Sequence, residues 1–188
     1  MSSNPISDAK LIARAVVHDD HHAFGELVRR HQSAVRSTLR RLTGGNIAYA
    51  DDLAQETFLL AYRNLKSFRQ EAKFSTWLYR IAYNVFLADA RKMKEVPMPE
   101  DADGELLAVP DTAAPSMSQQ AALNIDLERA MLVLSEAERA AIVQCYHNDL
   151  SHEEAAHVLG CPVGTVKTHI LRAKQKLKAR LGAWSPQA

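Results

Sequence analysis

The chain has 188 residues, of which 47% are hydrophobic and 24% are charged, a composition that is ordinary for a globular protein of one or two domains. No apolar run reaches the length of a membrane span, and residues 1–10 lack a signal sequence, so we expect a cytoplasmic protein. With 7 Gly, 7 Pro and few runs of alternating polarity, the sequence favours an all-α fold. The two cysteines and the histidine-rich residues 18–22 lack the spacing of a metal quartet, so we expect no metal, disulfide framework or cofactor.

The net charge of +1 conceals an uneven distribution of charge along the chain. Residues 1–95 carry 15 basic and 10 acidic side chains, and residues 163–188 carry 6 basic and no acidic ones. Between them, residues 96–128 carry 7 acidic side chains and no basic one. The pattern predicts two basic lobes separated by an acidic tether.

Four helices are predicted in residues 1–95. Ser7 is placed to cap the first, the second spans about residues 21–41 before Gly44 and Gly45 end it, and the third spans about residues 48–65. His31 falls on the apolar stripe of the second helix and is predicted to be a partly buried core residue. Ser75 is predicted to cap the fourth helix.

One face of the third helix combines acidic and amide side chains with a leucine at spacings of three and four residues. These are Asp52, Gln55, Glu56 and Leu59. Such a face is either plain solvent surface or a docking surface for a basic partner helix.

The loop before the fourth helix mixes basic and aromatic residues. Its members include Lys66, Phe68, Arg69, Lys73 and Phe74. Basic groups hold phosphates and aromatic rings stack on unpaired bases, so the loop suits single-stranded nucleic acid, although its aromatic rings could equally pack on the bundle. Arg80 and Asn84 lie one turn apart on the fourth helix, and an Asn side chain can read a base edge.

Residues 96–118 contain four prolines and no helical periodicity, which predicts an extended or mobile linker. Helices are expected again over about residues 117–134 and after the capping box of Ser135 and Glu138.

The last predicted unit is a helix-turn-helix. Ser151 and Glu154 have the spacing of a capping box, Gly160 can end that helix, and Pro162 suits the first turn of the next. The apolar stripe of the final helix consists of Val163, Val166, Ile170, Ala173, Leu177 and Leu181. Its polar side carries Thr165, Lys167, Thr168, His169, Arg172 and Gln175, followed by Lys174, Lys176 and Lys178. A basic polar face on the final helix, the second of the helix-turn-helix, favours DNA binding in the major groove.

Three blocks of sequence occur in a fixed order: DLAQETF at residues 52–58, FSTWLYRIAYN at residues 74–84, and GTVK through RAK between residues 164 and 174. Together they resemble the extracytoplasmic-function (ECF, group IV) sigma factors of bacterial RNA polymerase, of the sigma-70 family. The resemblance implies two helical domains joined by a flexible acidic linker, the second a helix-turn-helix of winged-helix type that needs no wing. The implied boundaries are residues 1–95 for region 2, 96–120 for the linker and 121–184 for region 4.

The resemblance also implies roles for particular residues. Asp52, Gln55, Glu56 and Leu59 would dock on the β′ clamp of core polymerase, and region 4 would meet the β flap. Lys66, Phe68, Arg69, Lys73, Arg80 and Asn84 would hold the melted −10 element, while Thr165, Lys167, Thr168, His169, Arg172 and Lys176 would contact the −35 element. Members of the family are often held by a cognate anti-sigma factor. Residues 165–169 read TVKTH where the family commonly has TVRSR, so the −35 sequence of typical members is not carried over.

Two other classes of protein are alternatives for this sequence. A LuxR-type helix-turn-helix regulator shares the TVKTH sequence, but it usually carries a receiver domain of alternating strands and helices, which residues 1–95 do not suggest. An enzyme is the second alternative. The sequence contains no P-loop, metal quartet or nucleophile triad spacing, so we expect no catalytic activity.

Overall fold

A computed structural model describes residues 6–95 and 130–182. All regular elements in these two ranges are helical, which confirms the all-α prediction. The predicted linker and most of the helix predicted over residues 117–134 lie outside the described residues. Among the helices of the described ranges, none combines the length and apolar character that a membrane span requires.

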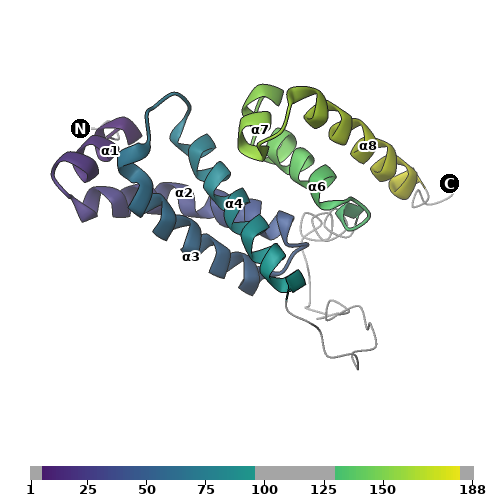
Figure 1. The fold of residues 1–188 in the computed structure, drawn as a ribbon, viewed down its shortest axis with the longest axis horizontal. Helices are drawn as coiled ribbons and strands as arrows, with labels where there is room; N and C mark the ends of the chain where they lie inside the picture. Colours follow the sequence, from purple (N-terminus) through teal and green to yellow (C-terminus); the bar gives the residue numbers. More distant parts are fainter. Residues whose placement is uncertain (1–5, 96–129, 183–188) are drawn as a thin grey trace, which may run out of the picture.

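The N-terminal bundle consists of α1 (Asp8–Val17), α2 (His21–Leu42), α3 (Ile47–Asn64) and α4 (Phe74–Glu95) (Figure 1). Helix α2 packs against the other three helices of the bundle, and α3 also packs against α4. The buried residues of α2 recur at helical spacing, so one apolar stripe serves all these contacts. They are Ala23, Leu27, Val35, Thr38, Leu39 and Leu42.

Neither of the two caps predicted for residues 1–95 forms a capping hydrogen bond, and α2 is capped by a residue that was not predicted. Asp20 caps α2 by accepting from the backbone N–H of Ala23 at 3.0 Å. Ser7 precedes α1 but its side chain makes no capping hydrogen bond. The prediction that Ser75 caps the fourth helix is wrong, because α4 begins at Phe74 and Ser75 lies within its first turn. The Phe74 side chain is buried.

The predicted core position of His31 is confirmed. Its Nε2 atom lies 2.7 Å from a carboxylate oxygen of Asp8, and its ring meets Phe74 edge-on. Arg30 also reaches Asp8, at 3.2 Å. These contacts tie the start of α1 to the middle of α2 and to the first turn of α4.

The C-terminal unit consists of α6 (Glu136–Ile142), a π-helical turn η2 (Val143–His147), α7 (His152–Leu159) and α8 (Val163–Gly182). Both predicted capping boxes, at Ser135 and at Ser151, are present. The π-helical turn was not predicted, and the side chain of Tyr146 on it is exposed.

The turn between α7 and α8 has the predicted geometry. Gly160 adopts φ 66° and ψ 32°, a left-handed conformation that side chains with a Cβ atom disfavour. Pro162 precedes α8, and its carbonyl accepts from the N–H groups of Thr165 and Val166, so it caps the helix instead of occupying the first turn. Val166, Ile170 and Ala173 are buried, as the stripe predicted.

The C-terminal unit lies against the N-terminal bundle at two places: α7 packs on α4, and α6 with η2 packs on α2 (Figure 1). The molecule therefore presents a closed arrangement of its two helical units.

Candidate functional site

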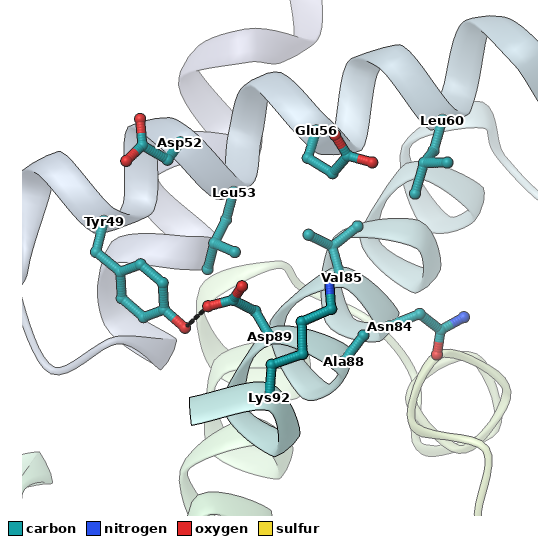
Figure 2. A pocket seen from close by; sticks show the side chains of 10 residues that line it. All are labelled: Tyr49, Asp52, Leu53, Glu56, Leu60, Asn84, Val85, Ala88, Asp89 and Lys92. Atoms are coloured by element: carbon teal, nitrogen blue, oxygen red, sulfur yellow. Dashed lines mark hydrogen bonds between the residues drawn. The ribbon is translucent and has the colours of Figure 1, made fainter. Parts of the chain in front are cut away.

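A groove of about 630 Å³ runs between α3 and α4, and its lining is rich in charged side chains (Figure 2). Asp52 and Glu56 reach it from α3, while Asn84, Asp89 and Lys92 reach it from α4. Because three carboxylates and one lysine line the groove, its net charge is negative. The groove thus combines two residues predicted to bind a protein partner with one predicted to bind a nucleobase.

A tyrosine and an aspartate that the sequence analysis did not single out order one end of this groove. The Tyr49 hydroxyl donates to Oδ2 of Asp89 at 2.6 Å (Figure 2). Partial burial, the hydrogen bond to Asp89 and the charge of Asp89 together raise the pKa of Tyr49 to about 12. The phenol therefore stays protonated at neutral pH and holds the Asp89 carboxylate at the groove wall.

The four predicted docking residues share the exposed side of α3. Asp52, Gln55 and Glu56 are exposed, and Leu59 is 44% exposed in spite of its apolar side chain. The opposite side of the helix is buried through Leu53, Thr57 and Ala61 among others, so the rotation of α3 is fixed.

The loop before α4 separates into an aromatic part and a basic part. The rings of Phe68, Phe74 and Trp77 lie 5.2 to 5.6 Å apart, and Phe74 is buried. Of the two interpretations left open by the sequence, the structure favours packing for these rings. The basic residues of the loop remain exposed, namely Lys66, Arg69 and Lys73.

Arg80 and Asn84 are both exposed on α4, one turn apart. Asn84 lines the groove, whereas Arg80 makes a contact that the sequence could not indicate. Its Nη1 atom lies 2.9 Å from Nε2 of His157 on α7. A residue predicted to bind DNA is thus engaged by the helix-turn-helix unit.

The polar face of α8 carries the residues predicted to contact the −35 element. Lys167, Thr168 and Arg172 are exposed, and Thr165 and His169 are partly exposed. The Thr168 hydroxyl donates to the carbonyl of Gly164 at 2.9 Å, which leaves its oxygen lone pairs available on the helix surface.

Two lysines of α8 turn back toward the rest of the C-terminal unit. Lys176 donates to the buried carboxylate of Glu138 at 2.7 Å. Lys174 lies 4.8 Å from the centre of the Tyr146 ring, a cation–π contact. Lys174, Lys176 and Lys178 are all exposed, but they differ in their contacts. Lys176 contacts Glu138 and Lys174 contacts Tyr146.

No metal site accompanies these surfaces in the described ranges, since no three side chains of His, Cys, Asp or Glu gather there. Cys145 and Cys161 are free thiols.

Comparison with protein families gives two matches. The model of Sigma-70 region 2 matches residues 27–95, and that of Sigma-70, region 4 matches residues 125–177. The first match includes α3, α4 and the groove between them. The second includes the helix-turn-helix.

Individual proteins give the same assignment. The chain is 36% identical to ECF RNA polymerase sigma factor SigW of Bacillus subtilis over 177 residues, covering 86% of this chain and 90% of the relative. It is 35% identical to the ECF RNA polymerase sigma-E factor of Haemophilus influenzae, with 94% and 96% of the two chains covered.

Two solved structures are similar along most of the chain. CnrH, solved in complex with the cytosolic domain of CnrY, has a TM-score of 0.68 at 29% identity and covers 94% of this chain and 97% of its own. The sigma factor RpoE of Bartonella quintana, solved with the anti-sigma factor NepR, has a TM-score of 0.67 at 29% identity, with 85% and 96% covered.

The chain therefore belongs to the ECF RNA polymerase sigma factors of the sigma-70 family. As such it is a transcription initiation factor that works with core RNA polymerase and promoter DNA. The alternative of a LuxR-type regulator gains no support, because residues 27–95 match region 2 and are helical where the structure describes them.

The Lys176–Glu138 pair leads to a prediction about stability. Removing the ammonium group in Lys176→Ala leaves a buried carboxylate whose remaining hydrogen bonds come from Ser135, so the free energy of unfolding should fall by about 1–2 kcal/mol. Lys178→Ala, two residues further on the exposed surface, should change it by less than about 0.5 kcal/mol. Urea titration followed by circular dichroism measures both.

The same pair predicts a pH dependence. The hydrogen bond from Lys176 lowers the pKa of Glu138 below its ordinary value of 4.5, so the pair stabilises the fold above that pH and the stabilisation is lost as the pH falls through the lowered value. Lys176→Ala should lose less stability on acidification than the wild-type chain. Equal losses in the two proteins would contradict the assignment.

Proposed function

We propose that this sigma factor binds core polymerase through the exposed face of α3, holds the melted −10 element with α4 and the loop before it, and reads the −35 element with α8. The observation that carries the proposal is the α3–α4 groove. It brings Asp52 and Glu56, from the docking face, next to Asn84, from the proposed base-reading face (Figure 2). The packed pair of helices α3 and α4 can then link polymerase binding to promoter melting.

The docking surface is proposed to receive a basic helix of the β′ clamp. Two exposed carboxylates on successive turns of α3 supply charge complementarity, and the exposed Leu59 supplies an apolar contact in line with them. Such a mixture suits recognition of an amphipathic helix. Asp89, held by Tyr49, adds a third carboxylate from the α4 side of the groove.

The −10 surface is proposed to use charge and amide chemistry more than ring stacking. Lys66, Arg69 and Lys73 are exposed and can hold phosphates. Asn84 offers both a donor and an acceptor at the groove, as reading the edge of a single unpaired base requires. Phe68 is partly exposed but packed on Phe74 and Trp77, so we assign it a supporting role in shaping the loop.

The −35 surface is proposed to consist of Thr165, Lys167, Thr168, His169 and Arg172. Among these, Arg172 has the planar donor group that binds guanine in two places, so it is the residue assigned to base reading. Lys178 is assigned to phosphate contact. Lys176 has a structural partner in Glu138, which makes its contribution to DNA binding smaller than the sequence suggested.

The remaining assignments follow from the family. Residues 1–95 are proposed as the region 2 domain, 96–120 as the linker and 121–184 as the region 4 domain, which meets the β flap. The factor is proposed to act in the cytoplasm, where polymerase is found, without catalytic activity of its own. The structures of RpoE with NepR and of CnrH with CnrY support the proposal that this chain too has an anti-sigma partner.

The docking assignment predicts the effect of charge reversal. Replacing Asp52→Lys and Glu56→Lys together should weaken binding to core polymerase by at least about ten-fold, because attraction for a basic helix becomes repulsion. A fluorescence titration of labelled chain with core enzyme measures the affinity.

The matched control is the double variant Glu71→Lys and Glu153→Lys, which makes the same change in net charge at exposed sites away from α3. It should bind core like the wild type. If both double variants lose affinity equally, the effect is one of overall charge, and the α3 face is not the docking surface.

The −35 assignment predicts that base reading and phosphate contact can be separated. In holoenzyme, Arg172→Ala should weaken binding to the cognate promoter by about 1–3 kcal/mol, roughly 5- to 150-fold, and reduce discrimination against a scrambled −35 sequence. Lys178→Ala should weaken both promoters similarly and lower the slope of affinity against salt by about one unit. Equal weakening of both promoters by Arg172→Ala would make it another phosphate contact.

A further inference from the structure

The loop over residues 68–73, before α4, carries two of the basic residues proposed for the −10 surface, yet it contains no helical turn. Arg69 and Lys73 are exposed on it, and Gln70 has φ 58°, a left-handed conformation that is uncommon outside glycine. A free loop would sample many conformations, and ordering it on DNA would reduce the affinity. Contacts from the rest of the protein are therefore needed to hold this loop in one conformation.

Both ends of the loop are held by buried side chains. At its start, the short 3₁₀ turn η1 (Leu65–Ser67) packs against α1, and Leu65 is buried. The Phe68 N–H donates to the carbonyl of Leu65 at 3.1 Å, which closes this turn. At its end, the buried Phe74 ring contacts the rings of Phe68 and Trp77. The three rings thus join the two ends of the loop to each other.

A histidine of α2 lies against this ring cluster. The centre of the His31 ring is 5.3 Å from that of Phe74, and the two rings meet edge-on at 74°. Nε2 of the same ring lies 2.7 Å from a carboxylate oxygen of Asp8, the first residue of α1. An ionised carboxylate only accepts hydrogen bonds, so Nε2 carries a proton and donates it. This hydrogen bond fixes the rotation of the ring on which Phe74 packs.

Asp8 is held in place by a second residue of α2. Arg30 Nη1 donates to Oδ1 of Asp8 at 3.2 Å and also to the carbonyl of Ile6. Arg30 is anchored on its own helix by Glu26, at 2.9 Å. Because each oxygen of Asp8 has its own partner, the carboxylate is fixed in rotation. The side chain of His31 is only 17% exposed, so its hydrogen bond is partly shielded from water.

The Asp8–His31 pair lies apart from the residues proposed to bind DNA or polymerase. Those residues belong to α3, to α4 and the segment before it, and to α8, and none belongs to α1 or α2. The pair contacts the proposed −10 surface only through Phe74. An effect of this pair on promoter binding would therefore act through the position of the loop.

We propose that Asp8 and His31 are positioning residues for the −10 surface. Their hydrogen bond holds Phe74 and the ring cluster so that the loop presents Arg69 and Lys73 to the unpaired strand. The pair does not itself contact DNA, and it lowers the cost of ordering the loop when DNA binds. This inference rests on the −10 role proposed for the loop.

Tryptophan fluorescence of the free chain tests whether the pair holds the loop, with no polymerase or DNA present. The chain has two tryptophans, so a Trp184→Phe background leaves only Trp77, whose ring centre lies 5.2 Å from that of Phe68. In this background Asp8→Ala should raise the acrylamide quenching constant of Trp77 at least about 1.5-fold, because the loop opens locally more often. Asp8→Asn removes the same charge but keeps an accepting oxygen, so its quenching should match that of the background chain.

Arg14→Ala is the matched control. Arg14 joins the other end of α1 to Asp20, the cap of α2, at 2.7 Å, so its loss breaks a comparable polar contact between the same two helices. Quenching of Trp77 should not change in this variant.

His31→Phe supplies a second variant that keeps an aromatic ring beside Phe74 and removes the donor to Asp8. Its quenching should match that of Asp8→Ala. Combining the two changes should add no further effect, because both remove the same hydrogen bond.

Permanganate footprinting in holoenzyme tests the consequence for the promoter. On a promoter mapped by run-off transcription, Asp8→Ala and His31→Phe should each lower the reactivity of unpaired −10 thymines at least about three-fold. Their affinity for core polymerase should equal that of the wild type. Arg14→Ala and Asp8→Asn should melt the promoter like the wild type.

The inference is overturned if Asp8→Ala leaves either quenching or melting unchanged. It is also overturned if Arg14→Ala or Asp8→Asn reproduces the effects of Asp8→Ala, or if melting falls only in proportion to core binding. Absence of reactive −10 thymines with wild-type holoenzyme would instead contradict the proposed −10 function, and the quenching result would still decide whether Asp8 and His31 hold the loop.

Discussion

The burial of one stripe of α2 is the constraint on which both halves of the molecule depend. Leu27, Val35 and Leu39 hold α1, α3 and α4 around this helix, and that packing fixes the rotation of α3 and α4. The last turns of the same helix, from Thr38 to the glycine turn, receive the C-terminal unit. A change in the packing of α2 would therefore move the proposed docking face, the proposed −10 surface and the contact with the helix-turn-helix together.

Features governed by local rules could be predicted from the sequence. The capping boxes at Ser135 and Ser151 and the left-handed Gly160 depend on a few neighbouring residues, and all three are present. The features that could not be predicted depend on contacts distant in sequence. Phe74, not Ser75, begins α4, and its ring is buried against Trp77, while Lys176 contacts Glu138, 38 residues away. Helical periodicity in the sequence was enough to propose which candidate site residues share a face of α3 or of α4. It could not show that residues of the two helices line one groove.

Helix α4 links the proposed activities. Its buried side packs on α2 and α3, its groove side presents Asn84 beside the carboxylates of α3, and its remaining side is where α7 reaches Arg80. The proposed base capture and the contact with α7 thus use neighbouring sides of α4, and the proposed docking face lies on α3, across the groove from Asn84. This arrangement gives a physical route by which the position of the helix-turn-helix unit can affect the use of the −10 surface.

Reconstituted transcription measures whether the chain directs initiation by core RNA polymerase. Core polymerase would be incubated with genomic fragments from the source bacterium, with and without the purified chain, and the run-off transcripts mapped. We expect transcripts with defined start sites that appear only when the chain is present, each preceded by a shared pair of elements at −35 and −10. Binding of the chain to DNA without core enzyme, together with no new start sites in its presence, would contradict this expectation.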